Sequence, residues 1–279
     1  MPDKTIAFQG APGAYSHLAC REVFPELTPL PCVGFEDAFA AVTEGRAACA
    51  MIPIENSMAG RVADVHHLLP RSELGIVGEH FLRVHHQLLA PHGATLAGLK
   101  TVRSHVQGLA QCREFIRKHK LNPVVHADTA GAARDCAMRN DLTEAAIASK
   151  LAAETYDLAI VAGDIEDQHD NTTRFIILAK DGKHAPASEP HLITSLIFQV
   201  KNVPAALYKA LGGFATNAIN VTRLESYIGP GFSSAQFYLD VEGHPESVAL
   251  GRALDELRFF STFLRILGVY KAHPHRLGK

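Results

Sequence analysis

Hydrophobic residues along the first part of the chain form short apolar runs separated by amphipathic stretches. The runs at residues 5–8 and 48–52 are typical of buried strands. Between them, Phe35, Phe39 and Val42 share one face of a predicted helix. Strand, helix and strand in this order are typical of parallel sheets, so the pattern predicts an α/β fold with a mainly parallel sheet.

A second series of the same kind begins near Gly78 and predicts a second α/β lobe. Its elements are a strand at residues 85–90, a helix that carries Leu109, Cys112 and Ile116, a strand at 123–127 and an Ala-rich helix from Thr129. After these come a helix at 149–156, a strand at 158–161, a polar acidic stretch at 164–170 and a strand at 174–179. We expect the last strand to return to the first lobe.

Residues 181–191 (DGKHAPASEPH) lack apolar periodicity and are rich in glycine, proline, serine and histidine, which is typical of a linker. We place a domain boundary there. The predicted domains are residues 1–182 and 192–271. Within the first, one lobe covers about 1–77 with 160–182, and the other covers about 78–159.

The C-terminal segment predicts a compact domain of its own. Its elements are a strand (193–200), a helix (204–214), two strands (221–227 and 234–241), a helix (245–260) and a strand (264–270). This βαββαβ order is that of ferredoxin-like α+β folds. Pro204 suits a first helical turn, and Leu250, Leu254 and Leu257 form the apolar stripe of the second helix.

Composition narrows the class of protein. The chain has 279 residues, 47% of them hydrophobic, and a net charge of −2, so it has no basic surplus to hold a nucleic-acid backbone. No apolar run approaches the roughly 18 residues of a membrane span, and the start of the chain does not resemble a signal peptide. We therefore expect a soluble cytoplasmic protein that binds neither nucleic acid nor membrane.

The cysteines and histidines predict neither disulfides nor a metal site. The five cysteines are odd in number and widely spaced, which suits buried reduced thiols. The sixteen histidines are scattered, and adjacent ones such as His85 and His86 point in different directions on a helix or strand. No dinucleotide-binding glycine loop and no distinct catalytic triad is recognisable. We expect no metal and no cofactor.

Three polar clusters lie beside predicted strands, where α/β folds place ligand sites. They are residues 53–57 (PIENS), 104–112 (SHVQGLAQC) and 171–175 (NTTRF). In the first cluster, Glu55, Asn56 and Ser57 are expected just past the end of a strand, with their polar groups turned into a cleft. A helix N-cap followed by a surface helix is the alternative interpretation.

The other two clusters also have a functional and a structural interpretation. Backbone N–H groups at a helix start near Ser104 or His105 can hold an anion, with Gln111 two turns later, although a plain capped helix explains the same residues. Thr173 adjoins Arg174, whose planar guanidinium matches a carboxylate, although a surface ion pair explains it too. The residues by themselves leave these alternatives open.

Several motifs in chain order resemble those of the prephenate dehydratase family. They are FQGAPGAYS, IPIENSMAG, GEHFLRVHHQLL, SHVQGLAQC and the segment from Ala145 to Phe175, followed by a tail that resembles an ACT domain. The resemblance implies a two-lobed catalytic domain like a type 2 periplasmic binding protein, with the substrate in the cleft. It also implies a regulatory domain of ferredoxin-like fold at the C-terminus.

The resemblance further implies a carbon-oxygen lyase that converts prephenate to phenylpyruvate, CO₂ and water in L-phenylalanine biosynthesis. By the family pattern, Thr173 is central to catalysis, and Asn56, Gln111 and Glu55 are catalytic residues beside it. The implied substrate-binding residues are Arg174, which would hold a carboxylate, and Ser57, Ser104, Thr172, Phe175, Ala14 and Tyr15. Aromatisation of the substrate drives the reaction, so no metal or organic cofactor is implied.

The ACT-like tail implies feedback inhibition by L-phenylalanine at a subunit interface of a homodimer or homotetramer. The expected effector-binding residues are Ala205, Ala206, Leu207, Glu225 and Ser226. Ala205 stands where glycine is usual, and Tyr227 and Ile228 stand where the family has arginine and proline. These departures are expected to weaken phenylalanine binding, because an added Cβ crowds the ligand and tyrosine does not replace the lost charge.

Two alternative functions stay open. Arogenate dehydratases run the same chemistry on the transaminated substrate and share these motifs. A non-catalytic amino-acid sensor is the alternative from another class, because both folds are widely used for ligand binding. Intact Thr173 and Arg174 argue against lost catalysis. Since the first predicted strand begins close to Met1, we expect a monofunctional enzyme without a chorismate-mutase-like extension.

Overall fold

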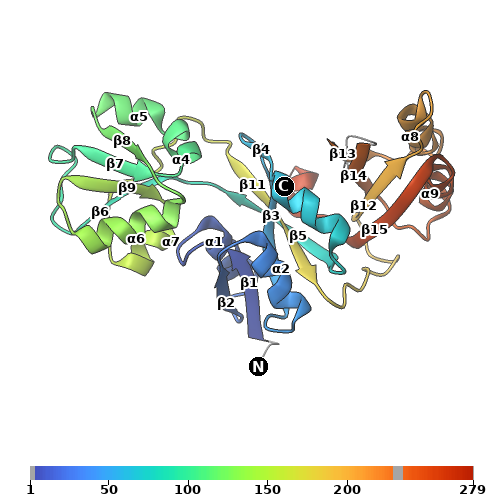
Figure 1. Cartoon of the computed structure of the whole chain (residues 1–279), viewed down its shortest axis with the longest axis horizontal. Helices are drawn as coiled ribbons and strands as arrows, with labels where there is room; N and C mark the ends of the chain where they lie inside the picture. Colours follow the sequence, from blue (N-terminus) through green and yellow to red (C-terminus); the bar gives the residue numbers. More distant parts are fainter. Residues whose placement is uncertain (1–3, 229–234, 279) are drawn as a thin grey trace. The chain divides into compact units, whose positions relative to one another are not determined.

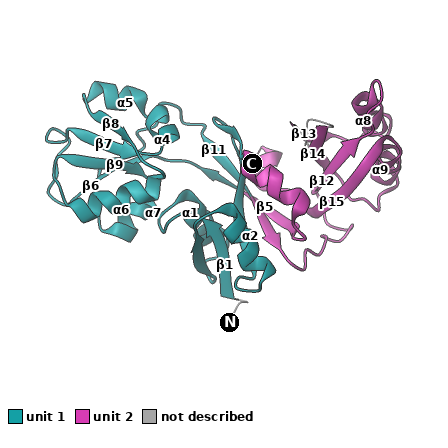
Figure 2. Ribbon diagram, viewed as in Figure 1, with its two compact units in different colours: residues 1–62, 81–175 teal, residues 63–80, 176–279 magenta. Residues whose placement is uncertain are grey.

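The computed structural model describes residues 4–228 and 235–278 of the chain (Figure 1). The described residues divide into two compact units (Figure 2). The first unit consists of residues 1–62 and 81–175, and the second consists of residues 63–80 and 176–279. Two strands, β5 (Gly75–Arg83) and β11 (Thr172–Ala179), have residues in both units.

The first sheet has the strand order β2-β1-β3-β11-β5, with the short β4 paired to β3. Strand β1 is parallel to both β2 and β3. Its buried residues, Ile6 to Phe8, are at most 1% exposed. The elements of this part are β1 (Thr5–Gln9), α1 (Tyr15–Val23), β2 (Thr28–Cys32), α2 (Phe35–Thr43), β3 (Cys49–Asn56) and β4 (Gly60–Arg61).

The second sheet lies entirely within the first unit and has the strand order β10-β6-β9-β7-β8. Strand β7 is parallel to β8 and β9, whereas β6 is antiparallel to β9 and β10. Its elements are β6 (Gln87–Ala90), β7 (Thr101–Ser104), α4 (Val106–Gln111), α5 (Arg113–Lys118), β8 (Asn122–Val125), α6 (Thr129–Arg139), β9 (Glu144–Ala148), α7 (Lys150–Tyr156) and β10 (Ala159–Ala162).

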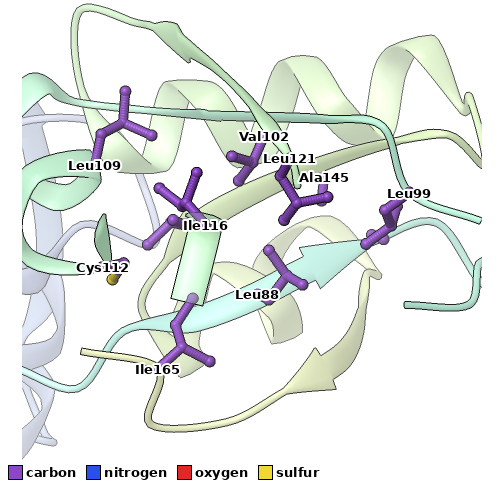
Figure 3. Close-up of a cluster of buried hydrophobic side chains, with 11 residues drawn as sticks. Leu88, Leu99, Val102, Leu109, Cys112, Ile116, Leu121, Ala145 and Ile165 are labelled. Atoms are coloured by element: carbon purple, nitrogen blue, oxygen red, sulfur yellow. The ribbon is translucent and has the colours of Figure 1, made fainter. Parts of the chain in front are cut away.

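A buried cluster fixes α4 and α5 on this second sheet. Leu109 of α4, Ile116 of α5 and Cys112 between the two helices pack with Leu88 and Val102 from the strands (Figure 3). Burial of each leucine, isoleucine or valine side chain stabilises the fold by about 1.5–3 kcal/mol. Because Leu109 and Cys112 are anchored in this core, the position of the intervening Gln111 is determined by packing.

Two segments connect the sheets of the first unit and lie beside each other. One leads from β5 to β6 and the other from β10 to β11. Val84 N donates to Asn171 O at 2.8 Å, and Ile165 N donates to His86 O at 3.0 Å. These hydrogen bonds hold the two crossing segments together without a regular sheet.

The second unit contains a four-stranded antiparallel sheet with the order β13-β14-β12-β15. This order and the βαββαβ sequence of elements are those of a ferredoxin-like fold. Helices α8 and α9 share one core with the sheet, in which Phe198, Phe214 and Leu254 are at most 2% exposed. The elements are α3 (Ala63–Leu68), β12 (Leu192–Val200), α8 (Ala206–Thr216), β13 (Val221–Ile228), β14 (Ala235–Glu242), α9 (Val248–Phe260) and β15 (Ser261–Lys271), with short 3₁₀ turns at Leu69–Arg71 and Pro274–Leu277.

Most predicted elements are confirmed, and several predicted bounds are wrong. Strand β3 continues to Asn56 instead of ending at residue 52, and β6 begins at Gln87 instead of residue 85. Helix α8 begins after Pro204, at Ala206, and α9 begins at Val248. Residue Ser234, the expected start of a strand, lies outside the described residues.

The parallel pairing expected in the first sheet is found between β1, β2 and β3, whereas the second sheet is mixed. Strands β2, β5, β7 and β9 were not predicted. β2 carries two prolines, β5 has two glycines and charged residues, β7 is short and polar at alternate positions, and β9 is rich in alanine. Such sequences have a weak strand signal in isolation.

No helix within residues 4–228 and 235–278 is long and apolar enough to cross a membrane.

Candidate functional site

A cavity of about 320 Å³ lies in the first unit and is lined by strands of the first sheet and by loops and helices next to the second sheet. Its size is typical of sites for small molecules. The apolar part of the lining includes Pro53, Val62, Val84 and Phe175. The polar lining residues are Gln9, Tyr15, Ser16, Asn56, His86, His105, Gln107, Gln111, Asp128, Thr129, Asn171 and Thr173.

Asn56 is oriented by the tight turn that follows β3. Its side-chain Oδ1 accepts hydrogen bonds from the backbone N–H groups of Met58 (3.0 Å) and Ala59 (2.9 Å). The amide Nδ2 must therefore be the group that donates to Asn171 Oδ1 at 2.7 Å and to Thr173 Oγ1 at 2.9 Å. The helix N-cap interpretation of this cluster is wrong, because β3 turns into β4 here and the next helix begins at Ala63.

The orientation of Asn56 determines the orientation of two further amides. Since Asn171 Oδ1 accepts from Asn56, Asn171 Nδ2 is the group that donates to Gln111 Oε1 at 2.9 Å. The same Gln111 oxygen lies 2.7 Å from His86 Nε2. An amide oxygen only accepts, so His86 carries a proton on Nε2.

Burial keeps the two ionisable groups at this end of the cavity uncharged. The pKa of His86 is lowered mainly by burial, and the hydrogen bond to Gln111 opposes that shift. The pKa of Tyr15 is raised well above its usual value, again mainly by burial, with Cys112 and Glu166 adding to the shift. The Tyr15 hydroxyl lies 2.8 Å from both His86 Nδ1 and His85 O. A neutral imidazole with its proton on Nε2 leaves Nδ1 as an acceptor, so His85 O and His86 Nδ1 share the single hydroxyl proton of Tyr15.

Thr173 is positioned to donate a hydrogen bond into the cavity. Its hydroxyl oxygen already accepts from Asn56 Nδ2, so the hydroxyl proton is available to a bound molecule. Hydrogen bonds that form a chain polarise one another, which makes such a hydroxyl a better donor. The arrangement can therefore assist the departure of an oxygen leaving group.

Six of the eleven catalytic or substrate-binding residues predicted from the sequence line this cavity: Asn56, Gln111, Thr173, Phe175, Ala14 and Tyr15. The other five lie outside its lining. Ser104 is fully buried and donates to Ile147 O at 2.7 Å. Ser57 Oγ accepts from Thr172 N at 2.9 Å, and Thr172 Oγ1 donates weakly to Asp170 O at 3.4 Å.

The remaining two, Arg174 and Glu55, form an ion pair with an N···O distance of 3.2 Å. The Arg174 side chain is 2% exposed, so the alternative of a surface ion pair is wrong. The guanidinium also lies 6.0 Å from the centre of the Phe81 ring. The pair joins β3 to β11. Glu55 is the sequence neighbour of Asn56, and Arg174 is the sequence neighbour of Thr173.

At the start of α4, where an anion site was predicted, one of the backbone N–H groups already donates to a side chain of the protein. His105 is the N-cap, and its Nδ1 accepts from Gln107 N at 3.3 Å. The helix has only six residues, so its dipole is small. The capped-helix interpretation accounts for this cluster, whereas Gln111 at the far end of the helix lines the cavity.

Asn171 belongs to the predicted polar cluster at residues 171–175, whereas His86, Asp128 and Thr129 were missed as cavity residues. The signal for His86 was present in the motif GEHFLRVHHQLL and in the expectation that adjacent histidines point apart. His86 lines the cavity and its neighbour His85 does not. The part of the chain that the structure describes has one group of side chains that could hold a metal ion. It consists of His85, Asp164 and Glu166, and it also lies outside the cavity lining.

Two other cavities lie in the second unit. The predicted effector residues Ala205, Ala206 and Leu207 line a cavity of about 340 Å³, whereas Glu225 and Ser226 belong to β13 and do not. A larger cavity of about 390 Å³ is lined by residues that include Arg276 and His244. Arg276 is engaged there by Glu79 and Asp240.

Comparison with known proteins finds one family of similar proteins. The prephenate dehydratase family model matches residues 6–183. A Komagataeibacter europaeus protein described as a bifunctional N-acyl-homoserine lactone acylase/prephenate dehydratase is 52% identical over 98% of both chains. Arogenate dehydratase/prephenate dehydratase 2 of Arabidopsis thaliana is 40% identical over 95% of this chain and 72% of its own length.

A solved structure is similar over nearly the whole chain. It is the prephenate dehydratase of Arthrobacter aurescens in complex with L-Phe, with a TM-score of 0.88 and 30% identity. The similarity covers 96% of this chain and 90% of that one. Both units of the present chain are therefore included in the comparison.

Proposed function

Because this chain belongs to the prephenate dehydratase family of lyases, we propose that its substrate is prephenate and that the cavity of the first unit is where the reaction occurs. The products are phenylpyruvate, CO₂ and water. The observation that carries the proposal is the hydrogen bond from Asn56 Nδ2 to Thr173 Oγ1, which leaves the Thr173 proton for the substrate.

The reaction needs a group that stabilises a departing hydroxide. The bond between the ring and its carboxylate breaks, its electron pair enters the ring as CO₂ leaves, and the ring hydroxyl departs with the electrons of its C–O bond. Thr173 donates a hydrogen bond to that oxygen, and a proton from solvent completes the water. Hydrogen-bond assistance of this kind contributes about 10²- to 10⁴-fold to rate.

Asn56 and Gln111 orient the ring substituents in this proposal. Both amides are held by fixed partners, so they need little rearrangement when the substrate binds. Phe175 and the apolar lining face the ring. A role for Arg174 at a substrate carboxylate stays a prediction, since its guanidinium is engaged by Glu55.

The first test measures phenylpyruvate formation from prephenate by the purified full-length chain, in parallel with arogenate. Product from prephenate at a higher kcat/KM than from arogenate supports the proposal. Product from arogenate alone would reassign the substrate. Lack of product from either substrate in a folded preparation would reject the lyase proposal and favour a binding function.

A second activity is proposed from the relative that is 52% identical and is described as also an N-acyl-homoserine lactone acylase. Amide hydrolysis requires a nucleophile and a base. Among the described residues, no hydrogen bond joins a serine or threonine hydroxyl of the cavity to an imidazole. Both ring nitrogens of His86 are engaged, Nε2 by Gln111 and Nδ1 by Tyr15, so His86 would have to give up one of these hydrogen bonds to activate a water. Release of homoserine lactone from an N-acyl derivative by the purified chain tests this activity.

We also propose that the ferredoxin-like part of the second unit is an ACT domain that binds L-phenylalanine in a homo-oligomer. The cavity beside Ala205, Ala206 and Leu207 supports the location, and a relative has been crystallised with L-Phe. Inhibition of prephenate turnover by L-phenylalanine, with a change in oligomer mass by light scattering, is expected. Unchanged turnover at millimolar phenylalanine would remove this proposal and leave the lyase proposal intact.

A further inference from the structure

Outside the cavity, the two crossing segments of the first unit bring one histidine and two carboxylates together. His85 lies between β5 and β6, whereas Asp164 and Glu166 lie between β10 and β11. His86 N donates to Glu166 Oε2 at 2.9 Å, which fixes the buried carboxylate against the other segment. We call His85, Asp164 and Glu166 the crossover cluster.

The atoms of the crossover cluster are spaced like the ligands of one small metal ion. His85 Nδ1 lies 3.2 Å from Asp164 Oδ1 and 3.1 Å from Glu166 Oε1, and all three atoms lie within 4.8 Å of one another. In a tetrahedral zinc site with bonds of about 2.0–2.2 Å, neighbouring ligand atoms lie about 3.3–3.6 Å apart. Small side-chain shifts therefore suffice to place one ion among the three atoms.

The charge of the cluster also favours a cation. The Glu166 side chain is 1% exposed, and a buried carboxylate is costly unless a cation or hydrogen bonds offset its charge. Over residues 4–228 and 235–278, its ion-pair partners are the imidazoles of His85 (3.1 Å) and His169 (3.8 Å), without lysine or arginine. His85 Nδ1 carries at most one proton, so it donates fully to one carboxylate at a time.

We propose that the crossover cluster binds one divalent transition-metal ion of the zinc type. The ligands are His85 Nδ1, Asp164 Oδ1 and Glu166 Oε1, and His169 or water completes the tetrahedron. A mixed imidazole and carboxylate set selects zinc over magnesium and calcium, which prefer oxygen ligands alone. The side chains of His85 and Asp164 are 41% and 63% exposed, so an ion reaches the site from solvent.

Outer contacts already orient the carboxylates. Gln87 Nε2 donates to Asp164 Oδ1 at 3.0 Å, and His86 N holds the Glu166 oxygen that faces away from His85. Such partners are a regular part of metal sites in proteins. The ion links the two crossing segments and thereby stabilises their arrangement. Because its ligands lie outside the cavity lining, it takes no part in the lyase reaction.

The experiment uses the full-length chain after removal of metal with a chelator. Zinc chloride is titrated by calorimetry into the wild type and into Asp164→Asn, with magnesium chloride in a parallel titration. Residue 164 has φ +51°, a left-handed conformation that asparagine adopts readily, so the variant should keep its backbone. We expect the wild type to bind one more zinc ion than the variant, or to bind it at least about tenfold more tightly, and magnesium to bind neither.

Asp135→Asn is the matched control, because Asp135 lies in the same unit and pairs with His126 at 3.2 Å, without a second carboxylate and with Arg134 and Arg139 beside it. This variant should bind zinc like the wild type. Cobalt(II) added to the wild type should give the intense visible bands of a tetrahedral site. Equal zinc stoichiometry and affinity in wild type and Asp164→Asn would overturn the proposal. A wild type that binds no zinc would also overturn it.

Discussion

The side-chain amide nitrogen of Asn56 donates to the hydroxyl oxygen of Thr173 at 2.9 Å, across 117 positions of sequence. Two backbone N–H groups fix the orientation of Asn56, so the direction of this hydrogen bond is set by the turn after β3. Thr173 consequently accepts a hydrogen bond from the protein, and its hydroxyl proton is available to a molecule in the cavity.

Replacement of Thr173 by valine removes the hydroxyl and nearly preserves the shape. We expect kcat for prephenate to fall about 10²- to 10⁴-fold with a small change in KM, because the lost interaction acts on the leaving group. Thr155→Val is the control, since that hydroxyl donates to Leu151 O within α7. Wild-type kcat in a folded Thr173→Val enzyme would reject the role.

Asn171→Asp should reverse part of the amide chain. The carboxylate that this substitution introduces still accepts from Asn56, but its second oxygen faces Gln111 Oε1, so Gln111 is expected to flip and present its Nε2 to His86. The His86 proton then moves from Nε2 to Nδ1. Nitrogen-15 NMR of the imidazole should show Nε2–H in the wild type and Nδ1–H in the variant; an Nδ1–H tautomer in the wild type would contradict the deduced chain.

The lowered pKa of buried His86 predicts a pH-dependent stability. The unfolded chain takes up the proton near the usual pKa of about 6.5 and the folded chain only at lower pH, so the free energy of unfolding falls as pH drops below that value. The slope for one proton is at most about 1.4 kcal/mol per pH unit.

His86→Gln keeps a donor toward Gln111 and removes the titration. Urea unfolding at several pH values between 8 and 5.5 should show the wild type losing stability relative to this variant on acidification. Parallel curves for the two proteins would show that the pKa of His86 does not differ between the folded and unfolded chains.

Arg174→Met should destabilise the fold by about 3–5 kcal/mol, because it removes the buried cation that pairs with the Glu55 carboxylate. Glu55→Gln and Arg174→Met together should cost less than the sum of the single changes. Urea unfolding measures the loss, and KM for prephenate is determined alongside. A wild-type stability combined with a large rise in KM would assign Arg174 to the substrate instead of to Glu55.

Ala205→Gly should stabilise the second unit by about 1 kcal/mol, because Ala205 has φ +59° at the N-cap of α8, a left-handed conformation that costs an L-residue about 1–2 kcal/mol. Ala215→Gly, in the last turn of the same helix, should instead destabilise, by at most the cost of about 1 kcal/mol that glycine has in a helix interior. Thermal unfolding distinguishes them. Similar losses in both variants would contradict the strain at Ala205.

Local patterning predicted most of the elements because burial of one helix face or one strand leaves a periodic signal in the sequence. The helix from Phe35, the helix from Thr129 and the βαββαβ order of the C-terminal part all appear in the structure. The motif NTTRF was also recognisable, and it supplies Asn171 and Thr173 to the cavity. The bounds of β3 were missed since a strand end next to a tight turn carries the same residues as a helix N-cap.

The sequence by itself determined which residue types are available and in which order, including the amides and hydroxyls of the three polar clusters. The placement of those groups depended on partners far along the chain: Asn56 meets residues 171 to 173, and Gln111 meets His86 and Asn171. No local periodicity records which way an amide faces or which of two adjacent histidines lines a cavity. Tertiary packing decides both, because a buried polar group must satisfy its hydrogen bonds with whatever the fold brings beside it.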